Sequence, residues 1–235
     1  MNISASYYSA IGGRDKNEDA VSLLEYDERV LALAADGLGG HSDGELASAL
    51  AVKIVNNELI HQRISVVTLR KAIEKANEEI FRNKDSSGMK TTISAVWFDE
   101  WSALAANVGD TRIYQFRDGQ VIFQSRDHSV AQMAVLAGDI QPEEVRTSKE
   151  RHKLTRALGA QDEVSVDISH LEVQKGDALL LCTDGFWEKI RGAEMAKELI
   201  GESSAVTWME NMRARIADRG VENGDNHSAL AIIVG

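Results

Sequence analysis

The chain has 235 residues, of which 43% are hydrophobic and 27% are charged, an ordinary composition for one globular domain with a sizeable core. Its 37 acidic and 26 basic side chains give a net charge of -11, so the surface as a whole repels nucleic-acid phosphates and anionic lipid headgroups. The single cysteine, Cys182, excludes an internal disulfide, and the sequence contains neither a secretory leader nor an apolar membrane span. We therefore expect a cytoplasmic, monomeric protein with one domain over residues 1–235 and no nucleic-acid or membrane partner.

The first third of the chain alternates between strand and helix patterns. Strands are expected near residues 3–11 and 20–26, and the apolar run from Val30 to Ala35 reads as a third strand that stops at Asp36-Gly37. Two helices follow, and the second carries an apolar stripe along one face. Their expected ranges are 43–60 and 66–84.

From about residue 91 the hydrophobic period changes to that of strands joined by tight turns, which indicates an antiparallel meander. The expected strands are 91–98, 102–108, 111–117 and 120–125. Residues 129–160 are mixed and polar with short helical turns, and they look like an insertion rather than a core element. The remaining elements are expected to be strands near 163–170 and 177–183, a helix near 203–218 and a last strand near 227–234.

This order of elements favours an α+β fold over a parallel doubly wound sheet, because consecutive strands joined by tight turns pair antiparallel. We expect a four-layer α-β-β-α sandwich, in which two central antiparallel sheets are flanked by helices.

Acidic residues recur where the predicted apolar strands begin or end. One Asp-Gly pair is by itself most often a turn signal, as we expect for Asp118-Gly119. Carboxylates on separate strand ends can converge on one point, however, and a ligand set of oxygens alone suits magnesium or manganese rather than zinc. The acidic sites are Glu18-Asp19, Asp36-Gly37, Asp110, Asp184-Gly185 and Asp225-Asn226.

In their order and local sequence, these segments resemble the protein phosphatase 2C family, the metal-dependent PPM phosphatases. The resemblance runs from Arg14 to Ala231. Each segment is weak alone, but five of them in the family's order are specific. They are Arg14-Asp15-Lys16-Asn17-Glu18-Asp19-Ala20, Ala35-Asp36-Gly37-Leu38-Gly39-Gly40-His41, Asn107-Val108-Gly109-Asp110-Thr111-Arg112, Thr183-Asp184-Gly185-Phe186-Trp187 and Gly224-Asp225-Asn226.

The resemblance implies a binuclear site for Mn²⁺ or Mg²⁺. Asp36 would bridge two ions, Glu18 and the carbonyl of Gly37 would complete one side, and Asp184 with Asp225 would hold the other. Asp110 together with Asp184 resembles the ligands of a third position in bacterial members; the alternative for Asp110 is a cap on the turn into the strand 111–117. Two cations about 3.5–4 Å apart can share a water, lower its pKa and aim it at phosphorus, so no protein nucleophile is required.

Two further residues are candidates for contact with substrate. Arg14 is expected to bind the substrate phosphate, because a guanidinium fork matches phosphate oxygens; a surface ion pair is the alternative. Animal members carry a histidine directly after the Asp-Gly pair, where this chain has Leu38. His41, three residues later, is a candidate general acid, with a structural role at the start of the following helix as the alternative.

Residues 129–160 correspond to the family's flap beside the metal cleft, where specificity is often determined. The flap carries a local basic cluster that could receive a phosphorylated acidic peptide, although a solvated face is the commoner reason for such a run. The cluster consists of Arg146, Lys149, Arg151, His152, Lys153 and Arg156.

The implied activity is that of a bacterial serine/threonine protein phosphatase that reverses a cognate Ser/Thr kinase. The sequence has no Cys-x5-Arg phosphatase loop and no Gly-x-Ser-x-Gly elbow, which agrees with a mechanism without a protein nucleophile. Two alternatives remain open: a regulatory or substrate-binding member with little turnover, and a phosphatase of a small phosphoester.

Overall fold

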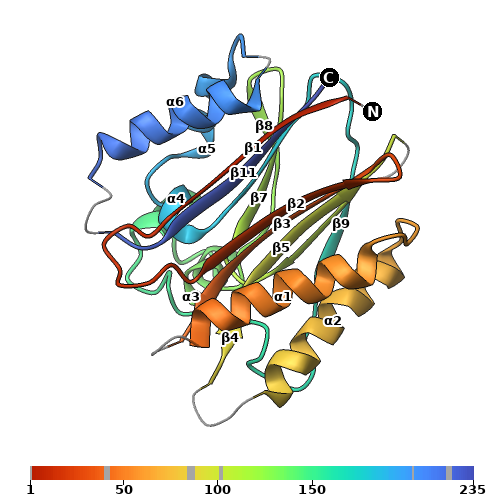
Figure 1. Cartoon of the computed structure of the whole chain (residues 1–235). Helices are drawn as coiled ribbons and strands as arrows, with labels where there is room; N and C mark the ends of the chain where they lie inside the picture. Colours follow the sequence, from red (N-terminus) through yellow and green to blue (C-terminus); the bar gives the residue numbers. More distant parts are fainter. Residues whose placement is uncertain (1, 40–42, 84–87, 101–102, 203, 221–223) are drawn as a thin grey trace.

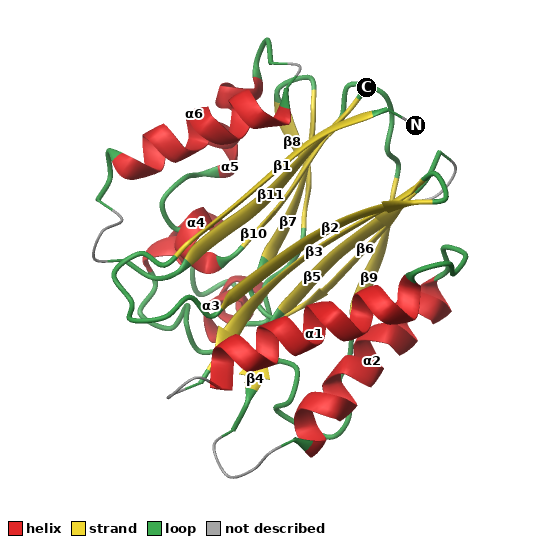
Figure 2. Ribbon diagram, in the orientation of Figure 1, coloured by secondary structure: helices red, strands yellow, loops and turns green. Residues whose placement is uncertain are grey.

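The structure is a computed structural model that describes the whole chain except residues 1, 40–42, 84–87, 101–102, 203 and 221–223. In this described part, two sheets face each other and helices cover their outer sides (Figure 1). Figure 2 shows the resulting order of layers: helices, sheet, sheet, helices. Every strand pairing is antiparallel in the residues described, so the expected α+β sandwich is confirmed.

The first sheet joins the two ends of the chain. Its strand order is β1-β11-β10-β7-β8. The strands are β1 (Ile3–Ala10), β11 (His227–Val234), β10 (Ala178–Cys182), β7 (Arg112–Arg117) and β8 (Gln120–Gln124).

The second sheet has the order β2-β3-β5-β6-β9, and the short β4 pairs with β3 beside this path. The strands are β2 (Asp19–Tyr26), β3 (Arg29–Leu38), β4 (Lys90–Thr91), β5 (Ile93–Phe98), β6 (Ala103–Val108) and β9 (Asp167–Leu171).

Two helices, α1 (Asp43–Leu59) and α2 (Val66–Arg82), pack on the second sheet within one core. Helices α5 (Gly192–Leu199) and α6 (Ala205–Ala217) pack in the same way on the first sheet. The short α4 (Asp184–Trp187) directly follows β10. No helix in the described part of the chain is both long and apolar enough to cross a membrane.

Strand β3 shows how alternation builds these layers. Its residues Leu31, Leu33 and Ala35 belong to the core beneath α1 and α2, whereas Val30, Ala32 and Ala34 belong to the core between the sheets. Because side chains alternate along a strand, the next residue of the second set is Asp36. The carboxyl group of Asp36 therefore occupies the end of the layer between the two sheets.

The strand does not stop where the sequence suggested. The apolar run ends at Ala35, but β3 continues to Leu38, because Gly37 and Leu38 pair with Thr91 and Lys90 of β4. Asp36 is thus held inside a hydrogen-bonded ladder rather than in a turn after it.

The expected meander is wrong as a description of one sheet. Strands β5 and β6 pair in the second sheet, whereas β7 and β8 pair in the first. The chain crosses from one sheet to the other at residues 109–111, where Gly109 adopts a φ of 104° that favours glycine. This crossing places Asp110 between the sheets.

The flap, residues 129–160, connects β8 of the first sheet to β9 of the second. It contains α3 (Val130–Ala137) and the 3₁₀ helix η1 (Pro142–Thr147), in agreement with the expected short helical turns. Ser129 caps α3 through a hydrogen bond from the Gln132 amide. Around residues 128–155 the flap is fixed at its base, because Thr155 N donates to the carbonyl of His128 and His128 N donates to that of Gly109.

Candidate active site

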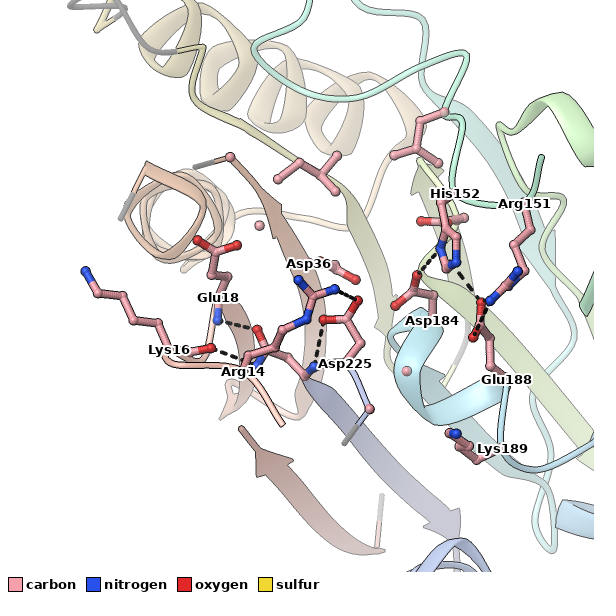
Figure 3. A pocket seen from close by; sticks show the side chains of 18 of the residues that line it. Arg14, Lys16, Glu18, Asp36, Arg151, His152, Asp184, Glu188, Lys189 and Asp225 are labelled. Atoms are coloured by element: carbon pink, nitrogen blue, oxygen red, sulfur yellow. Dashed lines mark hydrogen bonds and ion pairs between the residues drawn. The ribbon is translucent and has the colours of Figure 1, made fainter. Parts of the chain in front are cut away.

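A cleft of about 1000 Å³ opens at one end of the layer between the sheets. Carboxylates from four separate segments line this space: Glu18 before β2, Asp36 in β3, Asp184 in α4 and Asp225 before β11. Figure 3 shows Asp36 and Asp184 on either side of Asp225, with Glu18 to one side. All predicted site residues other than His41 line the cleft: Arg14, Glu18, Asp36, Gly37, Asp110, Asp184 and Asp225. His41 lies outside the described residues.

Asp36 is positioned by its strand partners. It stands opposite Asp19 in the register of β2 and β3. Its amide donates to Thr92 Oγ1 (2.9 Å), and its carbonyl accepts from Thr91 Oγ1 (2.8 Å) and Thr92 N (2.9 Å). These contacts fix the backbone on both sides of the side chain, so the carboxyl group has a rigid mount.

The segment before β2 is fastened to the start of β11 by one amide side chain. Asn226 Oδ1 accepts from the amide of Glu18 (2.8 Å), and its Nδ2 donates to the carbonyls of Ile11 (2.7 Å) and Lys16 (2.8 Å). Asn226 is buried, so these three contacts replace hydration that the backbone groups lose. The clamp holds Glu18 and the neighbouring Asp225 in one unit.

Gly37 has a packing role in addition to its expected carbonyl role. A Cβ added there would lie 2.1 Å from the carbonyl oxygen of Gly44 and 2.7 Å from that of Glu18. A Cβ at Gly44 would in turn lie 2.7 Å from Cδ of Glu18. Only glycine lets the first turn of α1 approach β3 closely enough to support the Glu18 carboxyl group.

Asp184 and Asp110 are joined through α4. Trp187 Nε1 donates to the carbonyl of Asp110 (2.9 Å), and the Arg112 guanidinium lies 3.5 Å above the Trp187 ring. A Cβ at Gly185 would lie only 2.1 Å from the carbonyl oxygen of Asn226, so the glycine allows α4 to pack against the segment that carries Asp225. Packing around α4 therefore fixes the positions of Asp110, Asp184 and Asp225 relative to one another.

Arg14, the predicted phosphate ligand, is paired with a carboxylate in this structure. Its Nη2 donates to Asp225 Oδ2 at 2.6 Å, and its side chain is 60% exposed. Figure 3 shows the guanidinium among Glu18, Asp36 and Asp225. Arg14 is thus anchored at the mouth of the cleft by one nitrogen, and most of its surface faces solvent.

Two residues that sequence reasoning did not assign to the site approach Asp184. His152 Nδ1 of the flap lies 3.4 Å from Asp184 Oδ2 and 3.9 Å from Glu188 Oε1. Arg151 Nε donates to the same oxygen of Glu188 at 2.5 Å. His152 was recognised only as part of a basic run, and Glu188 follows Trp187 without a distinguishing pattern, so no local signal could have placed either one here.

The electrostatics of the cleft favour bound cations. Burial raises the pKa of Asp36 well above its ordinary value, and repulsion from Asp184, Asp19 and Asp110 adds to the effect. Burial and Asp184 likewise raise the pKa of Asp110. Burial also raises the pKa of Asp19 to about 7, against hydrogen bonds from Ser228 and Thr183. A divalent cation bound among these carboxylates would relieve their mutual repulsion.

The donor set also fits hard divalent ions. Oδ1 of Asp184 is buried and has no hydrogen-bond partner among the described residues, and in Figure 3 one oxygen of Asp184 faces Asp36 and Asp225 while the other faces His152. An orphaned carboxylate oxygen among other carboxylates is suited to Mn²⁺ or Mg²⁺. His152 adds a nitrogen close to the position where a third ion was expected.

Comparison with known proteins identifies the family. A family model described as protein phosphatase 2C matches residues 8–221. The chain belongs to the protein phosphatase 2C family. A serine/threonine phosphatase stp from Listeria innocua is 32% identical over 197 residues, which cover 79% of this chain and 78% of that protein.

Solved protein phosphatase 2C structures share the whole fold. The serine/threonine phosphatase of S. agalactiae superposes with a TM-score of 0.87 at 26% identity and covers 100% of both chains. The catalytic domain of the phosphatase PstP, in complex with 2 manganese ions, gives a TM-score of 0.81 at 27% identity and covers 99% of both chains. The relatives of this chain are thus serine/threonine protein phosphatases of a metal-dependent family.

Proposed function

We propose that this chain hydrolyses phosphoserine and phosphothreonine in proteins, with two Mn²⁺ or Mg²⁺ ions held by Glu18, Asp36, Asp184, Asp225 and the carbonyl of Gly37. The observation that carries the proposal is the convergence of these carboxylates at one end of the intersheet layer, where Asp184 Oδ1 is buried without a partner. The manganese ions of the PstP complex support Mn²⁺ as the working ion.

When bound, a pair of divalent cations supplies an activated water and neutralises charge on the phosphoryl oxygens. The remaining work belongs to the protein. Asp36, rigidly mounted in β3, would lie between the two positions. Arg14 at the mouth of the cleft would orient the phosphate with its exposed guanidinium nitrogens, which match phosphate oxygens in geometry and charge.

Asp110, Asp184 and His152 would hold a third ion on the flap side of the cleft. Asp110 is buried and His152 is half exposed, so this position lies between the core and the flap. Its ligands differ in rigidity, since Asp110 is fixed by the sheet crossing and His152 belongs to the flap. We therefore expect weaker binding here than at the first two positions.

The biological setting follows from the activity. We infer that the substrates are proteins phosphorylated by a Ser/Thr kinase of the same cell, that the chain acts as a monomer in the cytoplasm, and that residues 1–235 form one catalytic unit. His41 stays a candidate general acid.

The test is hydrolysis of a phosphothreonine peptide by protein stripped of metal with a chelator and then supplied with Mn²⁺, Mg²⁺ or neither. A phosphotyrosine peptide and nucleotides serve as control substrates. We expect activity only with added ion and a preference for the phosphothreonine peptide. Preference for a nucleotide would favour the small-phosphoester alternative, and inactivity with every ion would favour a substrate-binding member of the family.

A further inference from the structure

A second group of basic side chains lies beside the cleft, on the side of α5 and α6. It consists of Arg146 in η1, Lys189 and Arg191 between α4 and α5, and Arg219 after α6, and we call it the cationic cluster. Lys189 also lines the cleft. Its backbone carbonyl accepts a hydrogen bond from Arg219 Nη1 (2.5 Å), so the cluster is continuous with the rim of the active site.

The acidic residues around the cluster are already engaged. Glu194 pairs with Arg219 and lies 3.6 Å from Arg215 Nη1, while its Oε2 also accepts the amide of Arg191 at 2.9 Å. The arginine neighbours, above all Arg219, lower the pKa of Glu194 to about 2. Glu194 therefore stays charged, and its oxygens already contact Arg219, Arg215 and the Arg191 amide.

Three basic side chains of the cluster have no carboxylate as an ion-pair partner among the described residues. In the described part of the chain, Arg146, Lys189 and Arg191 form no ion pair with an acidic side chain. Glu188, which lies nearby, pairs with Arg151 instead. In a protein with a net charge of -11, such an excess of positive charge in one place is a local exception.

Arg146 gives the strongest sign of an anion-binding position. Its Nη1 is buried and has no hydrogen-bond partner among the described residues. Burial above all, together with Arg191 and Arg219, lowers the pKa of this guanidinium, and the nearby carboxylates of Glu194 and Glu188 offset only part of that effect. A guanidinium nitrogen in this setting is stabilised when an anion binds to it.

We propose that the cationic cluster binds a second phosphoryl group on the substrate protein, so that the enzyme prefers segments phosphorylated at two positions. The inference rests on the proposed phosphatase activity, because Lys189 connects the cluster to the cleft that would hold the first phosphate. Arginine forks favour phosphate, and the acidic character of the remaining surface disfavours nucleic acid or a membrane as the source of that phosphate.

The experiment compares peptides in which the phosphothreonine to be hydrolysed is accompanied by a non-hydrolysable phosphonate. The phosphonate is placed two, four or six residues away on either side, and matched peptides carry alanine or glutamate there. For at least one spacing we expect KM with Mn²⁺-loaded enzyme to be about tenfold lower for the phosphonate peptide than for its alanine counterpart, and lower than for its glutamate counterpart.

Variants assign the effect to the cluster. In Arg146→Gln and Arg191→Gln the ratio of the two KM values should fall toward one, whereas Lys53→Gln, an exposed change on α1, should keep the wild-type ratio. An equal KM for the phosphonate and alanine peptides at every spacing, or a ratio that the cluster variants leave intact, would overturn the proposal. A gain with glutamate as large as with phosphonate would overturn the assignment to phosphate. Wild-type hydrolysis of the alanine peptide tests the phosphatase activity separately.

Discussion

Asp19 and Asp36 face each other as register partners of β2 and β3 at the end of the intersheet layer. The Thr183 hydroxyl donates a hydrogen bond to Asp19 Oδ2 (2.8 Å), whereas Asp36 lines the cleft. Two carboxyl groups in opposite positions repel each other unless a proton or a cation lies between or beside them. This pair therefore links metal binding to the stability of the fold.

The first prediction concerns Asp36→Asn. We expect turnover to fall by at least about 100-fold, because the proposed bridging ligand is lost. The metal-free protein should unfold at the same or a higher temperature than wild type, because a buried repulsion is removed. Thermal unfolding with and without Mn²⁺ should show that the ion-induced rise in Tm is smaller than in wild type. Full activity of this variant would refute the proposed site.

The second prediction concerns the Asn226 clamp. Asn226→Ala removes the hydrogen bonds to the carbonyls of Ile11 and Lys16 and from the amide of Glu18, so we expect a loss of about 2–3 kcal/mol in the free energy of unfolding. Urea unfolding in chelator measures this loss without a contribution from metal. The concentration of Mn²⁺ needed for half-maximal activity should also rise.

A matched control for the clamp is Asn83→Ala. The Asn83 amide also donates to a backbone carbonyl, that of Glu79, but at the exposed end of α2. A loss below about 1 kcal/mol is expected there, since water can replace the contact. Equal losses in the two variants would show that Asn226 is not a special clamp.

The third prediction concerns Arg14→Ala. Because the exposed guanidinium is proposed to hold the phosphate, KM for a phosphothreonine peptide should rise by about tenfold or more, with a smaller change in kcat. Arg14→Lys keeps the charge but loses the fork, so it should restore only part of the affinity. A variant that changes kcat alone would instead assign Arg14 to the alignment of Asp225, its partner in the structure.

The fourth prediction concerns the pH dependence of stability and a residue outside the cleft, Asp177. Asp177 is fully buried and accepts hydrogen bonds from Arg117 and Gln115. Burial alone would raise its pKa, but the contacts with Arg117, Gln174 and Gln115 outweigh burial and lower it. A carboxyl group with a depressed folded pKa stabilises the protein above its unfolded pKa of about 3.9, and this stabilisation disappears as the pH falls through the folded value.

Asp177→Asn should therefore cost about 2–3 kcal/mol at pH 7, and the difference from wild type should shrink as the pH falls below about 4. Denaturant unfolding of both proteins at a series of pH values measures this trend. A difference that stays constant down to the acid unfolding of the wild-type protein would show that the contribution of Asp177 does not depend on its charge.

Much of the architecture was predictable because its signals are local. The apolar stripe of α2 predicts that helix within a few residues of its observed bounds, 66–82 against the expected 66–84, and the structure adds a cap at Ser65. The unbroken apolar run from Val30 to Ala35 likewise predicts the strand β3, and the structure shows that both of its faces are covered. Periodicity and capping depend on neighbours in sequence, and so they can be read from one chain.

The acidic sites were also recognisable, because acidic residues recur beside the ends of the apolar strands in an order that resembles one family. Their convergence was an expectation that depended on the family resemblance. The structure brings the segments before β2 and before β11 together through Asn226, which bonds to residues more than 200 positions away in sequence. No local pattern specifies such a contact.

The sequence by itself therefore determined the elements, the fold class and the acidic residues of the cleft. Only the tertiary structure decided that the strands before and after Asp110 belong to different sheets, that His152 of the flap approaches Asp184, and that Nη1 of Arg146 has no hydrogen-bond partner among the described residues. The reason is physical: helix and strand formation depend on nearby residues, whereas sheet assignment and side-chain pairing depend on which distant surfaces bury each other.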